Sequence, residues 1–205
     1  KRIAQSTKDL SVRILIGGPW LLDGKVYNAY ISIYQGYIKI VSKKTHLPNY
    51  DVFDEKRFFV SADELELLDL GTLKIGFPIC EDVWHPDIVA RLKNMGADLI
   101  IIPNGSPYES SKLAERQATI KRRCKESNLP IIYLNLVGGQ DDLVFDGGSF
   151  VCDHNGKILC QFPQFVEKNW QVILERRKNS LAPLPNSLAE IGSRQSQDYK
   201  AVVLG

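Results

Sequence analysis

The sequence lacks the patterns that mark metal centres, membrane spans and nucleic-acid-binding surfaces. None of its four cysteines forms a Cys-x-x-Cys pair and its three histidines are scattered, which argues against a zinc site. No apolar run approaches the roughly 18 residues that a membrane span needs. A formal net charge of +2 over 205 residues gives no electrostatic footprint for nucleic acid or a membrane surface. We therefore expect no metal, no membrane and no nucleic acid among its partners.

Common phosphate-binding and serine-nucleophile motifs are absent as well. The sequence contains no Gly-x-Ser-x-Gly, and no glycine-rich phosphate loop follows a predicted strand. There is no signal peptide and no dense cysteine framework, so we expect reduced thiols and a cytoplasmic location. What the sequence does have is 44% hydrophobic residues, which is enough for one sizeable core.

The hydrophobic pattern predicts strand pairs in hairpins that alternate with helices. Strands are predicted at residues 12–16, 26–34, 37–42, 66–70, 73–79, 99–103, 131–136, 149–153 and 157–162, and helices at 86–95 and 113–127. In the second helix we expect Ala114, Ala118 and Cys124 to face inward, and the basic residues 121–123 to form a solvated face. Residues 43–59 read as a long loop of the kind that is usually functional. The pattern fits an α/β sandwich of mixed sheets covered by helices.

Cys80 lies where an apolar strand meets the turn before a helix. A nucleophile at a strand end is held rigidly, and backbone N–H groups of the turn can donate to an oxyanion. A reactive cysteine also needs a lowered pKa or an adjacent base. The alternative is a small, buried apolar residue, which is how we interpret the other three cysteines. Position alone leaves both interpretations of Cys80 open.

Lys44 lies just after the strand predicted at residues 37–42, at the start of the long loop. A lysine there could stabilise oxyanion charge or depress the pKa of a thiol. It could equally be a surface lysine, and only the neighbouring motif distinguishes the two.

Several strings, read together, resemble a known family. The segments KTHL (residues 44–47) and ICED (79–82) are similar to the lysine and cysteine motifs of the nitrilase superfamily, whose enzymes cleave amide or nitrile C–N bonds with a Glu-Lys-Cys triad. Five further strings resemble the glutaminase domain of bacterial glutamine-dependent NAD synthetases. These are HLPNY (46–50), VFDE (52–55), NGSPY (104–108), NLVGGQD (135–141) and VFDGGSF (144–150). A single string is weak, but five in matching order are specific.

The resemblance implies a fold, a domain organisation and partners. The fold would be a nitrilase-type αββα sandwich of mixed sheets with helices outside, over residues 12–178. Residues 179–198 would be a linker, and residues 199–205 the start of the first helix of a synthetase domain. The implied partners are glutamine, that synthetase domain and further copies of the chain in a homo-oligomer. No cofactor is implied for the glutaminase domain, whereas the synthetase domain would use ATP and Mg²⁺.

The resemblance also implies roles for individual residues. Cys80 would attack the glutamine side-chain carbonyl to form a γ-glutamyl thioester, with Lys44 holding the oxyanion and Glu55 supporting the lysine. The residues that match the glutamine-gripping positions are Tyr50, Glu81, Ser106 and Lys112. An anion for the ammonium group, with a cation and a hydroxyl for the carboxylate, suits a free amino acid.

One part of the family pattern is not found. The triad glutamate, the general base, lies in an N-terminal segment that precedes the strand matched by residues 12–16, and residues 1–10 contain no glutamate. We therefore expect the fold to be N-terminally incomplete, without its first strand and the segment of that glutamate. Both ends of the chain read as cuts through a longer protein. A general base contributes about 10²–10⁴-fold in rate, so we expect these 205 residues alone to hydrolyse glutamine very poorly. Two alternatives stay open: a stand-alone amidase, carbamoylase or nitrilase, and a non-catalytic remnant of the synthetase.

Overall fold

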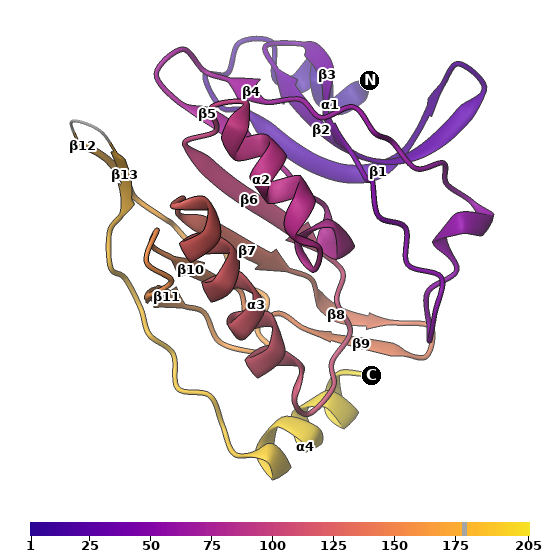
Figure 1. The fold of residues 1–205 in the computed structure, drawn as a ribbon. Coiled ribbons are helices and arrows are strands. Elements are labelled where there is room, and N and C mark those ends of the chain that lie inside the picture. Colours follow the sequence, from indigo (N-terminus) through magenta and orange to yellow (C-terminus); the bar gives the residue numbers. More distant parts are fainter. Residues whose placement is uncertain (178–179) are drawn as a thin grey trace.

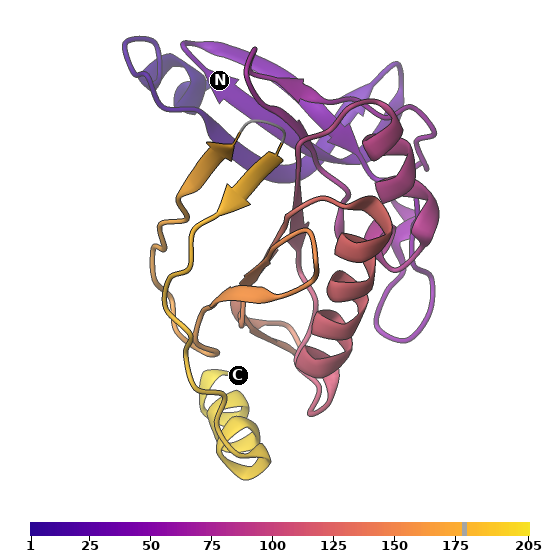
Figure 2. The ribbon, with the colours of Figure 1, turned by 60° about the vertical axis from the view of Figure 1, so that its left-hand side comes forward.

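Two β-sheets packed face to face form the centre of the fold, with helices on the outside (Figures 1 and 2). The structure is a computed structural model that describes residues 1–177 and 180–205. The helices are α1 (Arg2–Ser6), α2 (Pro86–Asn94), α3 (Lys112–Ser127) and α4 (Arg194–Leu204), with short 3₁₀ helices η1 (Glu55–Arg57) and η2 (Cys80–Val83).

The strands belong to a three-stranded sheet, a six-stranded sheet and two separate hairpins. The three-stranded sheet holds β1 (Ile14–Leu22), β2 (Lys25–Tyr34) and β3 (Tyr37–Lys43). The six-stranded sheet holds β4 (Leu68–Asp69), β5 (Lys74–Gly76), β6 (Leu99–Asn104), β7 (Ile131–Asn135), β10 (Phe150–Cys152) and β11 (Ile158–Gln161). The hairpins are β8 (Val137–Gln140) with β9 (Leu143–Asp146), and β12 (Leu174–Arg177) with β13 (Ser180–Pro183).

The three-stranded sheet is antiparallel throughout. Gln35 and Gly36 join β2 to β3 with φ values of 48° and 84°, the double positive φ that a two-residue hairpin turn requires. The first strand departs from its prediction. Instead of ending before Gly17 as a buried strand, it pairs with β2 through Leu22 and is largely exposed. Its place at the edge of the sheet explains this, because an edge strand tolerates Pro19 and exposure to solvent.

The six-stranded sheet is mixed, in the order β11-β10-β7-β6-β5-β4. Strands β5, β6 and β7 run parallel and the outer pairs are antiparallel. The apolar run of β6 is buried on both faces: Ile100 and Ile102 pack on the side of α2 and α3, and Leu99 packs toward the other sheet. Continuous apolar runs are typical of such doubly covered strands.

The contact between the sheets forms a second core. Tyr30 and Val41 of the three-stranded sheet pack against Phe77 and Ile79, which follow β5, and the rings of Tyr30 and Phe77 lie 5.4 Å apart. On the far side of the three-stranded sheet, Ala4 of α1 packs on strand β2. The layers therefore run helix, sheet, sheet, helix, which confirms the predicted αββα sandwich.

Helix α3 corrects the prediction of its inward face. Cys124 is buried as predicted, but Ala114 and Ala118 are exposed. Arg123, predicted on a solvated face, is buried and donates to the backbone carbonyls of Val83 and Trp84. A buried arginine needs such acceptors, and they come from a distant segment that helical periodicity does not reveal.

The C-terminal segment is more ordered than a linker. Within the range predicted as linker, β13 pairs with β12 and buries Leu181. Helix α4 begins at Arg194 rather than at Tyr199, because the Ser193 hydroxyl caps it by accepting a hydrogen bond from the Ser196 N–H. The predicted boundary between residues 178 and 179 lies outside the described residues. None of the helices in the described ranges is both long and apolar enough to cross a membrane.

Candidate active site

Cys80 stands in a strained turn, with three residues between it and the end of strand β5. It is the first residue of η2 and has a φ of +47°, a conformation that costs a non-glycine residue about 1–3 kcal/mol. Gly76 allows the strand to pass close beneath α2, since a Cβ there would lie 2.9 Å from a Leu92 methyl group. Packing thus fixes the strand, and the strand fixes the position of the thiol.

Asp82 ties the turn of Cys80 to the loop of Lys44. One carboxylate oxygen accepts the N–H groups of Thr45 (3.1 Å) and His46 (2.7 Å), and the other accepts the N–H of Ile79 (2.9 Å). Burial raises the pKa of Asp82, and the backbone donors oppose that shift. Sequence reasoning did not single out this residue, although it lies in the ICED string. Its signal was a carboxylate in the first turn of a short helix after a buried strand.

Buried Lys44 forms an ion pair with Glu55, which is half-buried. The lysine side chain is 1% exposed, and its Nζ lies 2.5 Å from Glu55 Oε1. Asn28 donates to the second oxygen of Glu55 at 3.3 Å. The structure therefore brings together the two residues that the resemblance paired, one from the end of β3 and one from the start of η1.

The electrostatic surroundings of the Cys80 thiol pull in opposite directions. Burial raises the pKa of the thiol, the Lys44 ammonium lowers it, and the carboxylates of Glu55, Glu81 and Asp82 raise it again. The net direction is upward. A thiol with a raised pKa is mostly protonated near neutral pH, so it needs a proton acceptor to become a nucleophile.

Two cavities meet at Cys80. The larger, about 720 Å³, is lined by Lys44, Glu55 and the strands around them. The smaller, about 360 Å³, is lined by all four residues predicted to grip the substrate, Tyr50, Glu81, Ser106 and Lys112. The thiol thus has the Lys44–Glu55 pair on one side and a pocket of polar side chains on the other.

The smaller cavity carries charges of both signs. Glu81 accepts a hydrogen bond from the Tyr50 hydroxyl at 2.8 Å, and its other oxygen lies 3.4 Å from His85 Nε2. Burial, followed by the contact with Glu81, raises the pKa of Tyr50. Lys112 supplies the cation, with its Nζ 3.4 Å from Glu115 and 5.3 Å from the centre of the Trp84 ring.

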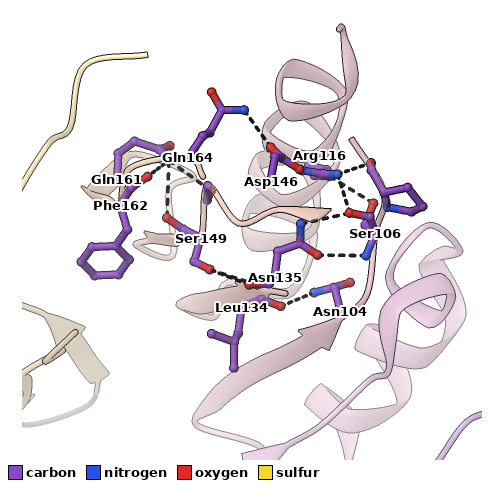
Figure 3. Close-up of polar contacts among 12 residues, drawn as sticks. Asn104, Ser106, Arg116, Leu134, Asn135, Asp146, Ser149, Gln161, Phe162 and Gln164 are labelled. Atoms are coloured by element: carbon purple, nitrogen blue, oxygen red, sulfur yellow. Dashed lines mark hydrogen bonds and ion pairs between the residues drawn. The ribbon is translucent and has the colours of Figure 1, made fainter. Parts of the chain in front are cut away.

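Ser106 is held by a buried polar network that sequence reasoning did not detect (Figure 3). Its backbone N–H donates to Asn135 Oδ1 at 2.9 Å, and its carbonyl accepts from Asn135 Nδ2 at 3.1 Å. Arg116 donates to the Ser106 hydroxyl and forms an ion pair with Asp146 at 2.8 Å. Asn135 and Asp146 lie within strings that resemble the family, but nothing in the sequence predicts their contacts with Ser106 and Arg116. Arg116 was predicted only as part of a helix.

A comparison of the sequence with models of protein families identifies one family. The model described as carbon-nitrogen hydrolase matches residues 1–181. The chain belongs to the carbon-nitrogen hydrolase family.

Curated relatives within this family carry a more specific name. The glutamine-dependent NAD(+) synthetase of Rhodobacter capsulatus is 42% identical over 190 residues, covering 93% of this chain and 34% of the relative. That of Thermotoga maritima is 34% identical over 209 residues, covering 100% of this chain and 36% of the relative. The chain therefore spans about a third of the length of these relatives.

Solved structures with a similar fold include two whose names bear on function. The glutamine-dependent NAD+ synthetase from Acinetobacter baumannii, solved in complex with ADP, matches with a TM-score of 0.89 and 33% identity over 98% of this chain and 38% of that one. A mutant amidase of the nitrilase superfamily from Nesterenkonia matches with a TM-score of 0.68 and 23% identity over 79% of this chain and 61% of that one. The second likeness shows the fold alone.

Proposed function

We propose that this chain hydrolyses the side-chain amide of glutamine, as the ammonia-supplying part of a glutamine-dependent NAD synthetase. One observation carries the proposal: a strained cysteine lies between the ion pair of buried Lys44 with Glu55 and a pocket with charges of both signs. The names of the relatives at 34–42% identity support it.

The smaller cavity would recognise the amino-acid end of glutamine. Glu81, oriented by the Tyr50 hydroxyl, would accept the α-ammonium group. Ser106 and Lys112 would donate to the α-carboxylate from the same cavity. The amide at the other end of the substrate then reaches Cys80, which lines this cavity too.

The chemistry would proceed through a thioester. The Cys80 sulfur attacks the amide carbon, and the developing oxyanion is held by the Lys44 ammonium and a backbone N–H of the Cys80–Glu81 turn. The proton that the thiol gives up passes to the amide nitrogen, which leaves as ammonia, and water then cleaves the thioester to glutamate and restores the thiol. Glu55, already engaged by Lys44, would orient that lysine rather than take the thiol proton.

The rest of the proposal concerns the whole protein. A synthetase domain would consume the ammonia with ATP and Mg²⁺, and we assign no residue of this chain to those ligands. A cytoplasmic location and a homo-oligomer also belong to the proposal. The low glutamine-hydrolysing activity expected of these 205 residues alone stays a prediction.

Substrate selectivity tests the proposal. The full-length natural protein should release ammonia from glutamine much faster than from asparagine or from simple aliphatic amides, which lack the correct spacing or the charged head group. The Cys80→Ser variant should lose this activity, whereas an exposed Ser6→Ala substitution should keep it. Faster turnover of a simple amide than of glutamine would show that the chain is an amidase of another kind.

A further inference from the structure

Arg116 is a fully buried cation that touches a residue of the smaller cavity without lining the cavity itself. Its side chain is 0% exposed. Its guanidinium donates through Nε to the Ser106 hydroxyl (3.1 Å), and through Nη2 to the carbonyls of Ser106 (2.9 Å) and Pro107 (2.6 Å). Its remaining contact is the ion pair with Asp146. Most of the donors of this arginine are therefore directed at one short segment.

The segment needs this support because the strand ladder ends just before it. Strands β6 and β7 pair up to Asn104 and Asn135, after which the chain of β6 turns away. The Asn135 side chain then takes both backbone groups of Ser106, as a further ladder residue would. Arg116 holds the same residue through its hydroxyl and its carbonyl (Figure 3). The backbone of Ser106 is thus fixed by two side chains that come from β7 and α3.

The direction of the hydrogen bond from Arg116 decides what the serine hydroxyl can do. A guanidinium has five N–H donors and no acceptor, so the Ser106 oxygen must be the acceptor in this contact. The hydroxyl hydrogen is then left to donate elsewhere, and Ser106 lines the cavity beside Cys80. A hydroxyl that accepts from a cation is also polarised, which makes it a stronger donor.

Asp146 neutralises the positive charge of the Arg116 guanidinium. Its first oxygen pairs with Arg116, and its second accepts from Gln164 Nε2 at 2.7 Å. Asp146 is 1% exposed, so both charges of the pair are removed from water. The pair therefore orients the serine and leaves Lys112 as the cation that lines the cavity itself.

We propose that Arg116, braced by Asp146, is a positioning residue that commits the Ser106 hydroxyl to donate to the α-carboxylate of the bound amino acid. This inference rests on the proposed function, and it adds a specificity device that lies behind the cavity wall. It predicts that loss of Arg116 weakens recognition of the carboxylate while leaving the reactivity of Cys80 itself unchanged.

Two electrophiles separate recognition from reactivity. Diazo-oxo-norleucine has the amino-acid head of glutamine; the thiol sulfur bonds to its diazo carbon, the thiol proton moves to that carbon, and N₂ leaves. Iodoacetamide has no head group and reports the thiol alone. With the full-length protein, Ser106→Ala and Arg116→Lys should each raise the half-saturating concentration of diazo-oxo-norleucine roughly ten- to hundredfold, and leave iodoacetamide labelling within about twofold.

Combining the variants tests whether they act through one hydrogen bond. The Ser106→Ala/Arg116→Lys double variant should be no worse than Ser106→Ala alone, because the arginine acts through the hydroxyl that is already missing. Arg122→Lys, the same change at an exposed position on α3, should behave as the wild type. If Arg116→Lys does not fold, the Arg116→Met/Asp146→Asn variant removes both charges together and should show the same selective loss.

Several results would overturn the inference. Wild-type selectivity in a folded Arg116 variant would do so, as would a parallel loss with both reagents or additive effects in the double variant. If the wild-type protein shows no saturable preference for diazo-oxo-norleucine over iodoacetamide, the proposed function fails as well. If the wild type shows that preference and the Arg116 variants keep it, only the role of Arg116 is lost.

Discussion

At Cys80, burial and a neighbouring ammonium act on the same thiol in opposite directions. The motif strings singled out this cysteine among the four. In the structure the other three are buried, whereas Cys80 is part-exposed. Its positive φ and the upward direction of its pKa depend on how the turn packs, which no string of letters encodes. At the residue scale, the place of Cys80 in a turn after a strand could be predicted and the environment of its thiol could not, and its role as nucleophile stays a prediction.

The pH dependence of alkylation follows from this environment. The thiolate is the reactive form and burial disfavours it, so labelling of Cys80 by iodoacetamide should rise with pH around a midpoint above the ordinary thiol pKa of about 8.5. Lys44→Met should move the midpoint further upward, because it removes the charge that lowers the pKa. A midpoint below that of a free thiol would contradict this account.

Asp82 should matter for stability because it joins two loops through three backbone N–H groups. Asp82→Asn replaces one acceptor oxygen by an amide that faces a donor, which should cost about 1–3 kcal/mol. For a domain of this size the melting temperature should fall roughly 2–4 °C per kcal/mol, measured by calorimetry. Asp9→Asn, at an exposed position, serves as the control and should stay within about 0.5 kcal/mol.

Two ion pairs of the site differ in how far the sequence predicts them. Lys44 and Glu55 were predicted as a pair from matching motifs and lie in contact. The pair of Arg116 and Asp146 joins a helix to a hairpin 30 residues later, and nothing in local periodicity or spacing marks it. Long-range polar contacts of this kind emerge only once the elements are placed.

At the scale of elements, turn chemistry was the most reliable guide. The hairpin at Gln35-Gly36 was predicted from the β-branched and aromatic residues that flank a two-residue turn, and the hairpin of β10 and β11 from the turn that contains Gly156. The hairpin of β8 and β9 was not predicted, and its strand β8 contains two glycines, at 138 and 139, which are unfavourable in strands. Strand lengths were also too long at β4 and β5, where only two or three residues pair.

Gly156 illustrates how a turn is fixed by its neighbour. It has a φ of +79°, and a Cβ there would lie 2.8 Å from the Lys121 carbonyl oxygen of α3. Gly156→Ala should therefore cost the backbone strain of about 1–2 kcal/mol plus a clash of about 1–3 kcal/mol. Gly24 has a similar φ of +74°, but a Cβ there would meet no atom within 4 Å. Gly24→Ala should therefore lower the free energy of unfolding only by the backbone strain. Equal urea midpoints for the two variants would show that the contact with α3 does not matter.

At the scale of the whole molecule, we expect the contact between the two sheets to make the sandwich unfold as one cooperative unit. Phe77 is 1% exposed and packs on Tyr30 across that contact. Phe77→Ala should destabilise the fold by about 3–5 kcal/mol, while Phe58→Ala, at an exposed position, should have little effect. Far-ultraviolet and near-ultraviolet circular dichroism should report one shared transition. Separate transitions would mean that the sheets fold independently.

The central claim is that Cys80 carries the γ-glutamyl group of glutamine during turnover. The most direct test is to quench the full-length protein in acid while it turns over glutamine, and to map its peptides by mass spectrometry. We expect a glutamyl adduct on the peptide that contains Cys80, and none in the Cys80→Ser variant. An adduct on Cys124, Cys152 or Cys160, or undiminished turnover by the Cys80→Ser variant, would contradict it.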